Sequence, residues 1–208
     1  MSSRDDRIIA MSKSLSDLPH ILFWVFVGIW IFFAIDPLHP FPWLYENFIV
    51  FIFVPAVVWS YYRFRLSNTA YVLIFIFAVL HVAASHYTYG STPWGNWFSQ
   101  LFEWDRNHYD RMVHFLYGLL MAGVARELFD RELTGSVLVR NAAAFGVIVS
   151  LGTLYEVGEF VAGVLLEPEE GLAFLGFQGD IWDTQKDMAL QALGAMLGLT
   201  AYSFYERK

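Results

Sequence analysis

The sequence has no cysteine among its 208 residues, which excludes disulfide bridges and thiolate metal sites. Charged residues are also scarce, at 16%, whereas an ordinary soluble domain has about 25%. Hydrophobic residues make up 57% of the chain, in blocks too continuous for a soluble domain of this length. The composition therefore indicates a protein that lies in a lipid bilayer.

An excess of basic residues is missing as well. The formal net charge is −7 at pH 7, and no basic stripe is present to meet phosphate groups. We therefore exclude nucleic acid as a partner. Aromatic residues, at 19%, are typical of a membrane protein with Trp and Tyr at the two interfaces.

Linkers, internal repeats and low-complexity tracts are absent, so we expect a single integral membrane domain over residues 1–208. Basic residues precede the first apolar block, as they do in a signal peptide. No small-residue cleavage site follows Phe33, however, and Asp36-Pro37 comes there instead. We interpret the first block as a membrane span that the protein retains.

Six apolar segments are long enough to cross a bilayer, since a spanning helix needs about 20 residues and about 17 at the short end. The fold class is therefore all-α, a polytopic transmembrane helical bundle with about six spans. We expect the spans at about residues 18–35, 46–62, 69–85, 110–129, 136–166 and 187–205.

The distribution of Lys and Arg predicts the orientation, because cytoplasmic loops carry the excess of these residues. Most basic residues fall on one side of the six-span arrangement: Arg4, Arg7, Lys13, Arg63, Arg65, Arg126, Arg131, Arg140, Arg207 and Lys208. The other side has Arg106, Arg111 and Lys186. Both termini are therefore expected in the cytoplasm.

Acidic residues and histidines gather toward the opposite side of the membrane. Three pairs have helical spacing: Asp110 with His114, Glu156 with Glu159, and Asp183 with Asp187. Residues three or four apart project from one face of a helix. Glu156 lies about 24 Å along its helix from Arg140, past the midplane. An ionised carboxylate at that depth costs several kcal/mol unless it is compensated.

Three kinds of positive charge could compensate these acids: the arginines Arg106 and Arg111, bound protons, or a divalent metal. Imidazole suits Zn and Fe, and carboxylate suits Mn and Mg, so a mixed site fits Zn, Mn or Fe. The expected metal ligands are drawn from His81, His86, Asp110, His114, Glu156, Asp183 and Asp187. The spacings loosely resemble those of di-metal four-helix carboxylate sites, but the Glu-x-x-His motif is absent.

A set of local motifs in the second half of the chain is specific in combination, although each piece alone is weak. The motifs are His86-Tyr-Thr-Tyr89, Arg106-Asn107, Tyr109-Asp110-Arg111 with His114, Arg126-Glu127, Tyr155-Glu156 with Glu159, and Gly176 through Gln178-Gly-Asp180 to Trp182-Asp183, Gln185 and Asp187-Met188. Together they resemble the YjdF-type bacterial inner-membrane proteins over about residues 80–198. The resemblance implies a multi-span protein of the bacterial inner membrane, and it implies no activity.

The pattern favours a metal-dependent hydrolase that works at the outer leaflet on a lipid or lipid-linked substrate. The metal would lower the pKa of a bound water. Glu159 would take the proton as general base, and Arg106 or Arg111 would hold an anionic headgroup. An integral membrane protein of this kind has the bilayer as its constant partner.

Other functions stay open. The carboxylates could carry protons or cations through a transporter. The polar cluster could instead be a set of structural salt bridges in a non-catalytic protein, with Arg106 and Arg111 satisfying the acids. A redox di-metal oxygenase is a further alternative, although its electron donors would lie on the cytoplasmic side.

Overall fold

The computed structural model describes residues 2–165, 171, 175 and 177–205, with side chains from Asp17 onward. Every regular element within these residues is helical. The elements are α1 Ser2–Ala34, α2 Pro40–Arg63, α3 Asn68–Tyr87, the 3-10 turn η1 Tyr89–Ser91, α4 Pro93–Leu101, α5 Tyr109–Glu132, α6 Val137–Leu165 and α8 Asp183–Tyr205. Leu166, Gly176, Arg207 and Lys208, which the sequence analysis used, lie outside the described residues.

The all-α prediction is confirmed, and each predicted span coincides with one long helix. Five of them, α1, α2, α3, α5 and α6, are long and apolar enough to cross a membrane. The sixth, α8, has 23 residues and begins with a polar turn. This turn includes Asp183 and Asp187, both of which are buried. A helix lined by protein does not need a continuously apolar surface, so six spans remain consistent with the structure.

Helix α1 begins at Ser2, well before the predicted span at residue 18. Two other helices also begin earlier than predicted, for local reasons. The second starts at Pro40 rather than near Glu46. Proline is favoured in the first helical turn, where its missing N–H has no partner to lose. The last starts at Asp183 rather than Asp187. A carboxylate in the first turn is stabilised by the positive end of the helix dipole.

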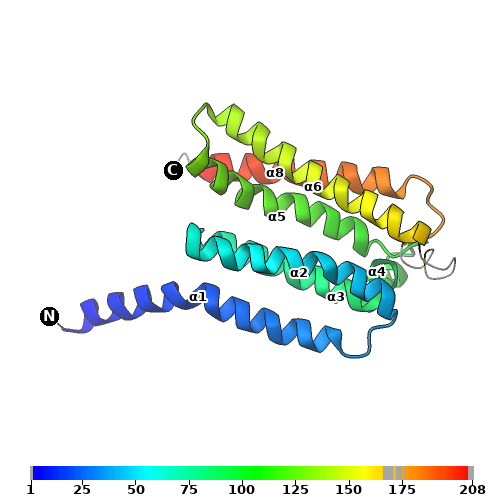
Figure 1. Ribbon diagram of the computed structural model, residues 1–208, viewed down its shortest axis with the longest axis horizontal. Coiled ribbons are helices and arrows are strands. Elements are labelled where there is room, and N and C mark those ends of the chain that lie inside the picture. The colour runs from blue at the N-terminus through cyan, green and yellow to red at the C-terminus, as the bar shows by residue number, and fades with distance from the viewer. Residues whose placement is uncertain (1, 166–170, 172–174, 176, 206–208) are drawn as a thin grey trace.

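Helix α5 is central in the bundle. It packs against α3, α6 and α8, while α1 and α2 pack against α3. In Figure 1, α5, α6 and α8 form one group of helices, and α1, α2 and α3 form the other. Helix α1 begins and α8 ends at the same end of the bundle (Figure 1). The opposite end carries α4 and the segments that lead into α2, α5 and α8.

Glycines set the close approach of α5 and α8. A methyl group at Gly118 would overlap the backbone oxygen of Gln191 on α8. One at Gly194 would overlap the backbone oxygen of Phe115, and one at Gly198 that of Leu119. The two backbones are therefore in direct contact, as small residues allow in membrane helices. The same close contact brings the polar first turns of α5 and α8 together.

Candidate functional site

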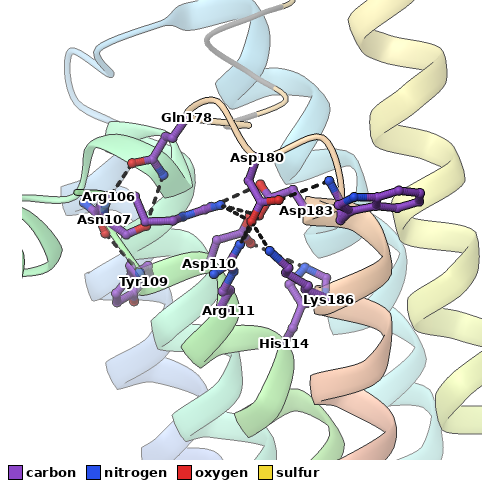
Figure 2. A network of polar contacts seen from close by, with 11 residues as sticks. Arg106, Asn107, Tyr109, Asp110, Arg111, His114, Gln178, Asp180, Asp183 and Lys186 are labelled. Atoms are coloured by element: carbon purple, nitrogen blue, oxygen red, sulfur yellow. Dashed lines mark hydrogen bonds and ion pairs between the residues drawn. The ribbon is translucent and has the colours of Figure 1, made fainter. Parts of the chain in front are cut away.

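All but one of the predicted acids and histidines meet at the end of the bundle opposite the two termini. Those that meet come from α3, α5, α6 and α8 and are buried. The buried members are His81, Asp110, His114, Glu156, Glu159, Asp183 and Asp187. Figure 2 shows the part of this cluster contributed by α5, α8 and the segments that precede them.

Three aspartates form the centre of the cluster. Asp110 on α5 and Asp183 and Asp187 on α8 each offer a carboxylate oxygen, and these atoms lie within 4.8 Å of one another. Asp187 is 2% exposed. Its Oδ1 accepts no hydrogen bond from the residues that the structure describes. A buried carboxylate oxygen without a hydrogen-bond donor lowers the stability of a protein. A bound cation or proton at this position would compensate that cost.

His114 lies beside the aspartates, one turn below Asp110. Its Nε2 is 3.4 Å from Oδ1 of Asp110 and 3.1 Å from Oε1 of Glu156. The imidazole therefore joins the α5 carboxylate to the α6 carboxylate. With Asp187 close to Asp110, the arrangement combines three or more oxygen ligands with one nitrogen ligand, a set that fits a divalent metal.

The two arginines pair with aspartates at the outer edge of the cluster. Both terminal nitrogens of Arg106 donate to Asp183, one to Oδ1 at 2.5 Å and the other to Oδ2 at 3.1 Å. Arg111 donates to Oδ1 of Asp183 at 3.1 Å and also pairs with Asp180. Lys186 completes the group, 2.5 Å from Oδ2 of Asp180 (Figure 2). The arginines thus neutralise Asp180 and Asp183, and within the described residues neither of them forms an ion pair with Glu156 or Glu159.

Asn107 and Gln178 fix the two segments that carry these charges. Oε1 of Gln178 accepts from the backbone N–H of Asn107 at 2.8 Å, and Nε2 of Gln178 donates to the backbone oxygen of Asn107 at 3.0 Å. Oδ1 of Asn107 also accepts from the N–H of Tyr109, an Asx turn that leads into α5. Gln178 and Gly179 have φ of 47° and 85°, the left-handed region that a tight turn before α8 requires.

The electrostatics of the outer edge favour negative charge. Both α5 and α8 begin here, so the positive ends of two helix dipoles face Asp110 and Asp183. The Lys186 ammonium holds the pKa of the Asp180 carboxyl below its usual range. Burial lowers the pKa of His108, which lies just before α5, and the charges of the nearby Arg111 and Arg106 lower it further.

His81 belongs to a second polar group that adjoins the first. Its Nε2 is 3.1 Å from the backbone oxygen of Glu46, which can only accept, so Nε2 carries a hydrogen. In the neutral ring Nδ1 then accepts from the hydroxyl of Tyr89 at 2.6 Å. Burial, with the charges of nearby carboxylates, raises the pKa of Tyr89, which keeps the hydroxyl protonated for this bond. Both ring nitrogens of His81 are therefore engaged.

Tyr155 on α6 connects the two groups. Its hydroxyl donates to Oε2 of Glu46 at 2.8 Å. Its ring lies at an edge angle to His114, with 5.8 Å between ring centroids, and 6.5 Å from the ring of His81. Glu159, the predicted general base, is one turn away from Tyr155 on the same helix and is buried.

His86 is the one predicted ligand that the structure places elsewhere. Its Nδ1 donates to the backbone oxygen of Phe33 on α1 at 3.0 Å, and its ring packs against Phe33 and Tyr87. His86 follows His81 by five positions, which correspond to about 1.4 helical turns. The two side chains therefore leave α3 in different directions.

Glu46 is a member of the cluster that the sequence analysis missed. It is buried, although the sequence pattern indicated only that a span begins there. A signal was available, since Glu46 is the only acidic residue between Asp36 and Glu103. Gln191, fully buried on α8 one turn after Asp187, was also missed. A lone amide in an apolar helix carries a weaker sequence signal.

Positive side chains do not balance the acids of the cluster. In the described part of the chain the buried carboxyl groups at this end are Glu46, Asp110, Glu156, Glu159, Asp183 and Asp187. They face Arg106, Arg111 and, when protonated, His81 and His114. Six carboxylates thus meet at most four positive side chains, and Arg111 is shared with Asp180. The remainder requires protons or a bound cation.

A large apolar cavity reaches this cluster from the middle of the bundle. It has a volume of about 730 Å³. Most of its wall is aliphatic and aromatic, from α2, α3, α5 and α6, and its polar end is lined by His81, Tyr89, His114 and Tyr155. The candidate site is therefore reached through an apolar space rather than only from its outer edge.

Comparison with known proteins agrees with residence in a membrane. Residues 18–208 match the family described as predicted membrane protein (DUF2238). The chain is also similar to the inner membrane protein YjdF of Escherichia coli strain K12, with 36% identity over 157 residues that cover 74% of each chain. No solved structure matches it.

Proposed function

This chain belongs to the DUF2238 family of predicted membrane proteins, as its resemblance to the YjdF-type proteins predicted, and we propose that it is a metal-dependent hydrolase within the bilayer. Its substrate would be a lipid or lipid-linked molecule. The observation that carries the proposal is the aspartate triad, Asp110, Asp183 and Asp187, with an unpartnered buried oxygen on Asp187.

A divalent metal at the triad would account for the uncompensated charge. Asp110 and Asp187 would supply oxygen ligands, His114 would supply Nε2, and Glu156 lies 3.1 Å from that nitrogen. Asp183 would connect the metal to the arginines, because both of its oxygens already accept from Arg106. The mixed ligand set fits Zn, Mn or Fe.

The side chains around the triad suit hydrolysis. A bound metal would supply a water of lowered pKa. Glu159, buried among these groups, would be the base that accepts the proton of that water. Arg106 and Arg111 each keep a buried Nε–H without a hydrogen-bond acceptor in the described residues. These two donors would hold an anionic part of the substrate.

Metal content of the purified protein tests the proposal directly. We expect close to one divalent metal per chain by elemental mass spectrometry, and loss of most of it in Asp187→Asn and in Asp110→Asn. Glu127→Gln is the matched control, because Glu127 lies on α5 but contacts Ser67 and Arg131 at the other end. Metal-free wild-type protein, with a stability that chelator does not change, would remove the proposal.

One observation favours a second candidate, a purely structural polar cluster. Arg106 binds Asp183 through two hydrogen bonds, and Arg111 contacts both Asp180 and Asp183. A structural cluster requires such ion pairs. In that case His114→Ala should prevent folding whether or not metal is supplied. A metal site predicts instead a folded His114→Ala protein with reduced metal content.

A through-pathway for protons or cations has less support. A layer of buried apolar side chains, among them Met121, Ala122, Ile148 and Ala195, lies in the core toward the other end of α5, α6 and α8. The polar residues beyond it are paired with one another: Arg126 with Asp130 and Asn141, and Arg140 with Asp130. Proton flux into liposomes that disappears in Glu156→Gln would favour the transporter over the hydrolase.

A further inference from the structure

We infer that the apolar cavity is a binding site for one hydrocarbon chain of a bilayer lipid, which enters sideways between α2 and α6. The polar group of that lipid would then lie at His114 and Tyr155. The inference deepens the proposed function, and the placement of the polar group of the lipid rests on that function. The apolar part of the cavity depends only on how the helices pack.

The cavity has the size and wall of a ligand site. Its volume of about 730 Å³ falls within the range of about 300–1,000 Å³ that is usual for bound small molecules. No Asp, Glu, Lys or Arg lines it within the described residues. Phe77 on α3, Tyr117 and Met121 on α5, and Ile148 on α6 form part of its inner wall. Such a wall suits a hydrocarbon chain and gives no partner to a charged solute.

The opening faces the bilayer. Helix α2 packs mainly on α3. The side-chain hydrogen bonds between α2 and α6 that the described residues form lie at the outer end. There Tyr45 donates to the backbone oxygen of Gly158 at 2.6 Å, and Tyr155 donates to Glu46 at 2.8 Å. Below these bonds the cavity is bordered by exposed residues of both helices, including Trp59 and Leu154. Exposed apolar side chains on a spanning helix are in contact with lipid.

The polar end of the same cavity indicates the orientation of the bound lipid. His114, which contacts Asp110 and Glu156, is part of the cavity wall. Tyr155 lines the cavity as well and is bonded to Glu46. A lipid with its chain among Tyr117 and Met121 would therefore place its first polar atoms beside the proposed metal ligands. A water-soluble molecule would find few hydrogen-bond partners in the apolar part of the cavity.

Photolabelling in a bilayer tests the inference. The protein is reconstituted into vesicles of phosphatidylethanolamine and phosphatidylglycerol that contain a phosphatidylcholine with a diazirine in one acyl chain. After irradiation, labelled residues are located by mass spectrometry. We expect label on Tyr117 and Met121, because they line the cavity and face away from bulk lipid. Label only on outward-facing residues would overturn the inference.

A cavity-filling variant sharpens the test. Ala56 lines the cavity on α2, so Ala56→Trp should lower labelling of Tyr117 and Met121 by roughly tenfold, equivalent to about 1.4 kcal/mol of binding. Ala142→Trp is the matched control, because Ala142 is exposed on α6 and does not line the cavity. Should Ala56→Trp not yield monodisperse protein, Val147→Trp on α6 makes the same test.

The outcomes separate this inference from the proposed hydrolase. Labelling that persists in the Trp variants would overturn the lipid site. Protein that is dimeric and carries no lipid adduct on the inner residues would overturn it as well. Metal content is measured on the same preparations. Metal without inner labelling refutes only the lipid site, whereas inner labelling without metal refutes the metal-dependent hydrolase and leaves the lipid site standing.

Discussion

The ion pair between Arg106 and Asp183 is the single interaction whose loss we expect to be most costly. Both side chains are buried, at 8% and 3% exposure, and they share two hydrogen bonds. Arg106→Gln leaves the Asp183 charge buried with only Arg111 beside it. Removing one partner of a buried pair costs about 3–5 kcal/mol. Unfolding by denaturant in mild detergent should show a loss near the lower end of that range.

Two further variants identify the cause of this loss. Arg106→Lys keeps the charge but cannot form the fork, so it should also destabilise the protein. Arg106→Gln combined with Asp183→Asn should recover part of the stability, because the stranded charge is removed. Arg131→Gln is the control, because the Arg131 side chain is 41% exposed and an ion pair with a solvent-exposed partner contributes at most about 1 kcal/mol. Equal effects of Arg106→Gln and Arg131→Gln would contradict the prediction.

At this scale the sequence predicted which residue types gather, and it could not predict which of them pair. Spacing along one helix placed His114 near Asp110, as the structure has it. Pairings between helices depend on helix rotation, which no local pattern specifies. The choice of Asp183 as the partner of Arg106, and the involvement of Glu46 from α2, therefore came only from the structure. That any of these residues binds metal stays a prediction.

At the scale of elements, the contact between α5 and α8 gives the next prediction. Gly194→Ala would push a methyl group into the backbone of Phe115, where no flexible side chain can move aside. Overpacking of a closely packed contact costs about 1–3 kcal/mol. We expect a lower thermal unfolding temperature and, since the site residues lie on the same two helices, reduced metal content.

Gly146→Ala serves as its counterpart. Gly146 is on α6, and apart from its own helix backbone no atom of the described residues lies within 4 Å of the position that a methyl group would take. Alanine is favoured over glycine inside a helix by about 1 kcal/mol, so this variant should be neutral or more stable. If Gly194→Ala proved as harmless as Gly146→Ala, the backbone contact between α5 and α8 would be in error.

The long helices were predictable because continuous apolar blocks of about 20 residues are typical of membrane spans. The short helix α4, Pro93–Leu101, was not predicted. It is too short to give a span signal, and its exposed Trp97 and Phe98 beside a buried Gly95 make sense only once its packing is known. In the described structure Gly118, Gly152, Gly194 and Gly198 each lie against an atom of a neighbouring helix, whereas Gly146 has no atom within 4 Å apart from its own helix backbone.

At the scale of the whole molecule, the arrangement of helices places the excess of Lys and Arg at one end of the bundle and the cluster of acids and histidines at the other. Helix α1 begins and α8 ends at one end of the bundle, where α2 and α5 end and α6 begins (Figure 1). Arg65, Arg131 and Arg140 lie in or next to these helix ends in the sequence. The candidate site lies at the other end. Cytoplasmic loops are the ones enriched in Lys and Arg. The fold thus agrees with termini in the cytoplasm and a site on the periplasmic side of the inner membrane, an orientation that stays a prediction, as does a single integral domain.

The absence of cysteine makes this orientation directly measurable, because a single introduced cysteine is the only thiol in the chain. Ser91, at the end of η1, and Ser136, before α6, are both exposed and lie at opposite ends of the bundle. In intact bacterial cells a membrane-impermeant maleimide should label Ser91→Cys and should label Ser136→Cys only after the inner membrane is permeabilised. The reverse pattern would place the site in the cytoplasm, where a hydrolase acting at the outer leaflet could not work. Labelling of both in intact cells would mean that the six long helices do not all span the membrane, and the shared site of α5, α6 and α8 would then belong to a bundle that crosses the bilayer differently.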